Sequence, residues 1–156
     1  MADSSEIDAA VITMLSGDAT LTAVATGGVF FGEAPQNSDR FVTVSLVTSH
    51  DEPKFGGRAY EEVFYDIQYV ERSTSGTNAK AAAKRIDELI ELQTLSATGF
   101  APMLMRRDER IRYAEVDDVD KSIRWQHRGG RYQVMVAPLT DPNAGAAWTQ
   151  PGWMQP

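Results

Sequence analysis

The chain has 156 residues, a formal net charge of −7 and no cysteine, and its length suits one ordinary domain. The lack of cysteine excludes a disulfide scaffold, a cysteine-ligated zinc site and thiol catalysis. The acidic balance argues against tight general binding of nucleic acid, which requires phosphate neutralisation. The longest uncharged stretches of the body, residues 19–32 and 92–105, contain glycine and fall short of the about 20 apolar residues of a membrane span. We therefore expect no membrane partner.

The N-terminal part of the chain predicts two short helical segments and a brief strand. Apolar residues recur at helical spacing behind a serine cap, at Ile7, Ala10, Val11, Met14 and Leu15. Gly17 ends this first helix, and a second helical turn is expected at residues 21–25. A short strand is expected at residues 29–31.

Two longer strands are expected at residues 41–48 and 62–71, because both are rich in residues that favour strands. The connection between them, residues 50–58, contains an Asp-Glu-Pro sequence and a Gly-Gly pair and is too long for a tight hairpin. We expect a mobile loop that projects from the sheet, with Phe55 as a candidate contact for a partner.

Residues 78–92 form the clearest helical pattern, with a continuous apolar stripe. The charges of this helix oppose its dipole, because Lys80 and Lys84 come early while Glu88 and Glu91 come late. One interpretation is that Lys84 and Glu88 pair at i, i+4. The other is that these charges face a neighbouring chain.

The remaining strands are expected at residues 103–105, 110–116, 122–127 and 131–137, with the Gly-Gly pair at 129–130 forming either a hairpin turn or a bulge in one long strand. Helices that are separate from mostly antiparallel strands indicate an α+β fold. We expect a mostly antiparallel sheet that packs against one long helix and one or two short ones.

The C-terminal segment differs in composition from the rest of the chain. Residues 138–156 hold four of the seven prolines and two of the three tryptophans, Trp148 and Trp153. We expect a domain at residues 1–137 followed by an extended arm at residues 138–156. Exposed tryptophans favour a role as interface anchors, and the alternative is a disordered terminus.

Catalytic and metal-binding patterns are poorly represented. Asp117, Asp118 and Asp120 lie close in sequence, but the glycine and glutamate positions of an EF-hand loop are not matched, so we expect an acidic turn. His127 could act as a base beside Ser122 or Asp120, although no nucleophile elbow or phosphate-binding glycine motif occurs. We expect no enzyme activity, no metal and no cofactor.

Arginines gather at residues 106–112 and again at 124–131. Acidic residues interrupt the first group, and arginines in strands usually pair with acidic neighbours. We therefore expect no nucleic-acid groove here.

The order of segments resembles the tail-completion or tail-terminator family of long-tailed bacteriophages. Residues 29–36, Val-Phe-Phe-Gly-Glu-Ala-Pro-Gln, resemble the family signature V-Y-x-G-x-A-P-Q, and residues 41–44, Phe-Val-Thr-Val, resemble the strand that follows it. Residues 64–70, the helix at 78–90 and the strand from His127 to Val136 are similar to its later elements. The resemblance covers about residues 6–137 and does not reach the arm.

This resemblance implies a non-enzymatic virion component of the tail or neck. Family members form a ring, usually of six copies, that caps the tail tube and joins it to the head-completion or connector proteins, with DNA only as a passenger. The net negative charge suits a channel through which DNA slides. Alternatives are another neck component, such as a head-completion or connector protein, or a small hydrolase. The candidate interface residues are Lys80, Lys84, Glu88, Glu91, Phe55, Trp148 and Trp153.

Overall fold

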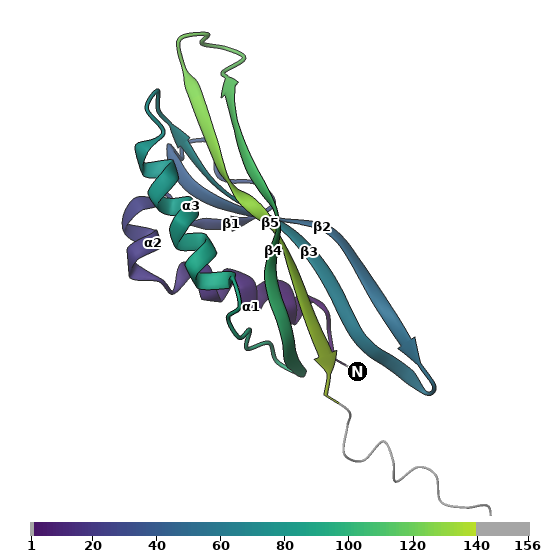
Figure 1. The fold of residues 1–156 in the computed structure, drawn as a ribbon. Coiled ribbons are helices and arrows are strands. Elements are labelled where there is room, and N and C mark those ends of the chain that lie inside the picture. Colours follow the sequence, from purple (N-terminus) through teal and green to yellow (C-terminus); the bar gives the residue numbers. More distant parts are fainter. Residues whose placement is uncertain (1, 140–156) are drawn as a thin grey trace, which may run out of the picture.

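The computed structural model describes residues 2–139, and it consists of a five-stranded sheet with three helices on one face (Figure 1). The strand order is β1-β2-β3-β5-β4, with β1 parallel to β2 and every other neighbouring pair antiparallel. The predicted α+β class is therefore confirmed. The elements are α1 (Ser5–Ser16), α2 (Ala19–Val24), β1 (Val29–Phe31), β2 (Arg40–Lys54), β3 (Gly57–Arg72), α3 (Thr77–Ile90), β4 (Phe100–Val116) and β5 (Arg124–Pro138).

The core lies between the sheet and the helices. On β3, alternate side chains face the helices and are buried, namely Val63, Tyr65, Ile67 and Tyr69. The apolar stripe of α3 covers them with Ala79, Ala82, Ile86 and Ile90. Period-two burial on the strand and helical-period burial on α3 are the patterns that the sequence predicts.

The predicted loop at residues 50–58 is wrong, because β2 and β3 stay paired as far as Lys54 and Gly57. Only Phe55 and Gly56 form the turn, and Gly56 has a φ of +85°, which glycine adopts readily. The polar residues that suggested a loop make contacts within the hairpin, since Arg58 Nε lies 3.0 Å from Asp51 Oδ1. Within this segment the strand pairing is irregular between Glu52 and Pro53, where a proline is tolerated in a bulge.

The four strand segments expected after residue 100 join into two long strands. The Gly-Gly pair at 129–130 lies inside β5, which pairs with β3 without interruption. It is neither a turn nor a bulge of β5. The irregularities lie in the edge strand β4 instead, between Pro102 and Leu104 and between Arg107 and Glu109. The four long strands lie side by side in a twisted sheet, and the ends of the two hairpins point in different directions (Figure 1).

The predicted arm falls almost wholly outside the described residues. Pro138 still belongs to β5, where it pairs with Phe100, and Trp148 and Trp153 lie beyond residue 139. The division at residue 137 stays a prediction.

Candidate assembly interfaces

The β2–β3 hairpin projects beyond the rest of the sheet (Figure 1). Pairing between β3 and β5 ends at Glu61 and Val136, while β2 and β3 continue to Lys54 and Gly57. A two-stranded ribbon is marginally stable alone. Phe55 lies at its tip with a fully exposed side chain, so the hairpin presents a large apolar group far from the core.

A buried carboxylate holds the base of this hairpin. Glu61 is 2% exposed, and it accepts hydrogen bonds of 2.8 Å from both Ser4 and Ser49 and one of 2.9 Å from Arg58. Because Ser4 lies next to α1, these bonds tie the hairpin to the helical layer. The projection therefore starts from a defined anchor.

The four charged residues predicted on the long helix have different roles in the structure. Lys84 Nζ lies 3.7 Å from Glu88 Oε1, and both side chains are exposed, so the i, i+4 pair exists. Glu91 accepts a hydrogen bond from the backbone N–H of Arg107 on β4. Lys80 lines a groove described below. That these charges also face a neighbouring chain stays a prediction.

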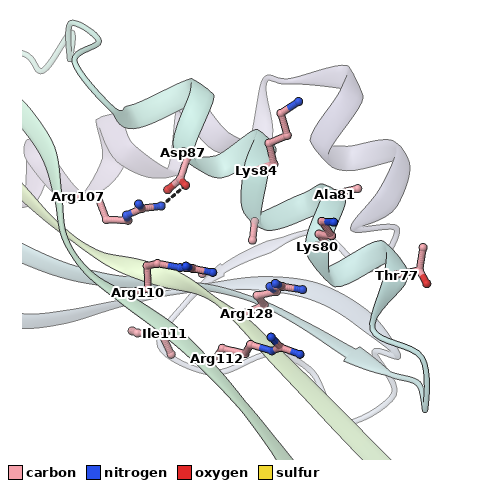
Figure 2. Close-up of a pocket in the computed structure, with 12 residues that line it drawn as sticks. Thr77, Lys80, Ala81, Lys84, Asp87, Arg107, Arg110, Ile111, Arg112 and Arg128 are labelled. Atoms are coloured by element: carbon pink, nitrogen blue, oxygen red, sulfur yellow. Dashed lines mark hydrogen bonds and ion pairs between the residues drawn. The ribbon is translucent and has the colours of Figure 1, made fainter.

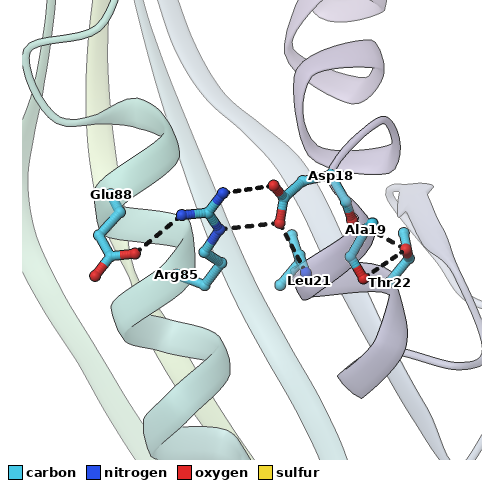
Figure 3. Close-up of polar contacts among 6 residues, drawn as sticks. All are labelled: Asp18, Ala19, Leu21, Thr22, Arg85 and Glu88. Carbon is cyan, nitrogen blue, oxygen red and sulfur yellow. Dashed lines mark hydrogen bonds and ion pairs between the residues drawn. The ribbon is translucent and has the colours of Figure 1, made fainter.

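Arg85 joins α3 to the start of α2 (Figure 3). Its Nε and Nη2 atoms donate to the two carboxylate oxygens of Asp18, at 3.0 and 2.6 Å. Asp18 is also the N-cap of α2, since it accepts a 2.8 Å hydrogen bond from the backbone N–H of Leu21. The Arg85 guanidinium and this N–H lower the pKa of Asp18. The side chain of Arg85 therefore stabilises the fold of this subunit by joining α3 to α2.

A basic groove of about 550 Å³ lies between α3, β4 and β5 (Figure 2). Among the described residues that line it, only Asp87 is acidic. Asp87 accepts hydrogen bonds from Arg107 and Tyr132 and is thus already paired. Burial and this carboxylate raise the pKa of Tyr132, which keeps its hydroxyl protonated. The cationic residues of the groove are Lys80, Lys84, Arg107, Arg110, Arg112 and Arg128.

The strand register explains how so many arginines reach one face. Arg107 and Arg110 would point to opposite faces of a regular strand. The irregularity between Arg107 and Glu109 inserts one extra residue, Asp108, so both arginines line the groove. Nothing in the residue spacing alone indicates this change of face.

Strand β5 contributes a further arginine, Arg128, to the groove. On β5, the face that carries the buried residues Tyr132 and Val134 continues to Arg128. Arg128 stands directly opposite Arg112 of β4. Figure 2 shows Arg110, Arg112 and Arg128 side by side below α3. Within residues 2–139, these three arginines and Lys80 have no ion pair.

The sheet face away from the helices carries an aromatic cluster that the sequence interpretation missed. The Phe41 ring centroid lies 6.5 Å from that of Phe30 and 6.4 Å from that of Trp125. Tyr113 stacks on His127 with centroids 4.3 Å apart. The rings of Phe41, Tyr113, Trp125 and His127 border a shallow hollow of about 520 Å³. The period-two pattern of β2 is a sequence signal for part of this cluster. Val42 and Val44 are buried on one face, so Phe41 lies on the other.

His127 is not part of a catalytic arrangement with the residues expected beside it. Its Nε2 lies 3.2 Å from Glu115 Oε2, and burial lowers its pKa while Glu115 opposes this shift. Ser122 instead donates a 2.7 Å hydrogen bond to Asp120. In the part of the chain that the structure describes, no group of three acidic or histidine side chains could hold a metal.

The acidic residues 117–120 form the turn that joins β4 to β5, as the sequence predicts. Asp117 stabilises the turn by accepting hydrogen bonds from the backbone N–H groups of Val119 and Asp120, at 2.9 and 3.0 Å. Asp118 and Val119 project outward and are fully exposed. None of the described helices is long and apolar enough to cross a membrane.

Comparisons with known proteins assign this architecture to a class. The sequence model described as "Tail completion protein gp17" matches residues 9–126. The fold, with its projecting hairpin and exposed apolar tip, is thus that of a structural protein of the virion tail or neck. The chain belongs to the tail completion protein gp17 family, and the resemblance seen in the sequence is confirmed.

Solved structures agree on the fold. A chain of the structure titled "Virion of native gene transfer agent (GTA) particle" is 19% identical with a TM-score of 0.57, and the match covers 83% of this chain and 94% of that one. A second solved structure is 14% identical with a TM-score of 0.52, over 85% of this chain and 95% of that one. No curated protein sequence matches significantly.

Proposed function

We propose that this protein is a tail terminator that forms a ring on the end of the tail tube and joins it to the neck. The observation that carries the proposal is the β2–β3 hairpin, which extends past the sheet and ends in the fully exposed Phe55. A large exposed apolar side chain on a projecting element is favoured where a partner buries it. In the ring, this tip contacts the adjacent subunit or the tube protein.

The ring has six copies and binds the tail tube protein on one side and a head-completion or connector protein on the other. DNA passes through its channel without being held. The formal charge of −7 supports this role, because like charges keep DNA from adhering to the channel wall. The protein has no catalytic role and needs no cofactor.

The C-terminal arm, residues 138–156, binds an adjacent subunit when the ring or particle assembles. Trp148 and Trp153 are its anchors, since tryptophan buries a large area and is enriched at interface hot spots. Truncation after Pro138 weakens assembly, and unchanged assembly of the truncated protein would contradict this role.

The second candidate is a connector or head-completion protein of the same neck. The family match to a tail completion protein supports the terminator more directly. Native mass spectrometry separates the two, because six copies indicate the terminator and twelve indicate a connector ring.

The experiment is complementation of particles made without this protein, scored by electron microscopy. Wild-type protein restores joined particles, and its absence gives tails of uncontrolled length or heads without tails. Phe55→Ser folds normally but fails to complement. Leu92→Asn is the matched control, since Leu92 is exposed outside the hairpin with a φ of +57° that asparagine tolerates. Full complementation by Phe55→Ser would overturn the role of the hairpin.

A further inference from the structure

The basic groove holds positive charge that the described subunit does not balance. Arg112 and Arg128 are directly opposite in the antiparallel register, an arrangement that destabilises a strand pair when both residues carry the same charge. Lys80 approaches from α3, and Arg110 lies two residues from Arg112 on the same face. A bound group with several carboxylates would relieve this repulsion.

The size and setting of the groove favour a narrow acidic segment over a nucleic acid. A volume of about 550 Å³ accepts a few side chains, like the small-ligand sites of about 300–1,000 Å³ found in other proteins. Duplex DNA requires a longer basic track along its backbone. The exposed Glu88 of α3 and the half-buried Glu91 directly after it would interrupt such a track and repel the DNA phosphates.

The chain itself presents a segment of this chemistry. The turn between β4 and β5 carries Asp117, Asp118 and Asp120, and the side chain of Asp118 is fully exposed. Its one ion pair with another described residue is a 3.8 Å contact with the exposed Lys121, which contributes little. The turn lies at the end of a hairpin that points away from the subunit (Figure 1).

We propose that the basic groove of one subunit receives the acidic β4–β5 turn of a neighbouring copy, with Asp118 entering between Arg112, Arg128 and Lys80. Turn and groove are different surfaces, so the contact is heterologous, and its repetition generates a ring when the rotation between neighbouring subunits closes. The inference rests on the proposed ring and specifies one of its subunit contacts.

Disulfide cross-linking in assembled particles tests the contact directly, because the wild-type chain has no cysteine. Val119→Cys combined with Lys84→Cys places one thiol on the turn, beside the intact Asp118, and one on the groove. Mild oxidation then gives a ladder of cross-linked subunits on a non-reducing gel. The control combines Val119→Cys with Thr13→Cys on α1 and gives monomers. A variant that enters particles without forming a ladder would overturn the inference and leave the ring proposal intact.

A charge exchange provides the second test. Arg112→Glu with Arg128→Glu reverses the groove and keeps a like-charged pair in register. Asp118→Lys with Val119→Lys reverses the turn and keeps the hydrogen bonds of Asp117 and Asp120. Each variant alone loses at least tenfold in joined particles, while thermal unfolding shows that it folds. Co-expression of the two restores assembly, because each turn then meets a groove of opposite charge.

The remaining outcomes separate this inference from its rivals. Absence of wild-type protein from particles would contradict the proposed function itself. Failure of the mixed variants to recover would overturn the turn-in-groove contact. The same holds if a short DNA duplex binds the wild-type protein at physiological salt and the groove variant loses that binding, since the groove would then serve nucleic acid.

Discussion

A Cβ atom on Gly129 of β5 would lie 1.9 Å from the backbone carbonyl oxygen of Ile67 on β3. Gly129 is therefore required by the close approach of the β3 and β5 backbones, which pair here with Gln68 opposite Gly129. A backbone atom cannot move aside as a side chain can. We predict that Gly129→Ala lowers the free energy of unfolding by about 3 kcal/mol or prevents folding.

Urea denaturation measures this loss against a control. At Gly32, which has a φ of +79°, an added Cβ meets no atom within 4 Å. Gly32→Ala should cost about 1–2 kcal/mol from backbone strain alone. Equal losses in the two variants would show that the close approach is not what requires glycine at residue 129.

The contact between Arg85 and Asp18 predicts a graded effect of substitutions at Asp18. Asp18→Asn keeps an N-cap acceptor for Leu21 but loses the charge pair, whereas Asp18→Ala loses both. We expect Asp18→Ala to lower the free energy of unfolding by about 1 kcal/mol more than Asp18→Asn does, which is the usual contribution of an N-cap. Glu88→Gln, on the exposed side of Arg85, should be nearly neutral. Equal stability of the two Asp18 variants in urea would contradict the capping role.

The same contact predicts a loss of stability in acid. Because the folded state lowers the pKa of Asp18 below its usual 3.8, the stabilisation is complete above this value and is lost as the pH falls through the folded pKa. Asp18→Asn should therefore flatten the pH dependence of unfolding below about pH 4. An unchanged dependence would show that the pair is not formed in solution.

The buried His127 predicts a second pH dependence of stability, at a pH closer to neutral. Burial lowers its pKa from the usual 6.5, so the unfolded chain takes up a proton before the folded one does. Stability is complete above pH 6.5 and decreases as the pH falls from there toward the folded pKa. His127→Phe should remove this decrease while keeping the stack on Tyr113. A decrease that persists in the variant would assign it to another group.

Glu61 predicts that the projecting hairpin can be loosened without unfolding the core. Glu61→Gln weakens the acceptor for Ser4, Ser49 and Arg58, and hydrogen bonds to charged groups contribute about 1.5–3 kcal/mol. Amide hydrogen exchange should accelerate at residues 51–60 and stay unchanged in α3. Glu52→Gln, on the exposed part of β2, is the control. Uniform acceleration across the chain would mean that Glu61 stabilises the whole domain.

Local patterns in the sequence were sufficient for the fold class. The alternation of Val63, Tyr65 and Ile67 and the stripe of α3 follow from periods of two and of about 3.6 residues, and both elements are found where they are predicted. The hairpin at residues 50–58 was missed because Asp51 and Pro53 disfavour strands. In the structure Asp51 forms an ion pair with Arg58 across the hairpin, a contact that no local pattern contains.

The candidate surfaces also divide into those that a single segment forms and those that several segments form together. Phe55 and the acidic turn were recognisable as single segments. The groove was not, because it combines Lys80 with Arg112 and Arg128, which come together only in the tertiary structure. The extra residue at Asp108 also changes which face the arginines occupy.

The central claim is that this protein forms a ring where the tail meets the neck. Cryo-electron microscopy of intact particles tests it most directly. The account predicts six copies of this fold at the head-proximal end of the tail tube, with the hairpin tips at Phe55 in contact with neighbouring chains. Twelve copies, or the absence of this fold from that position, would contradict it.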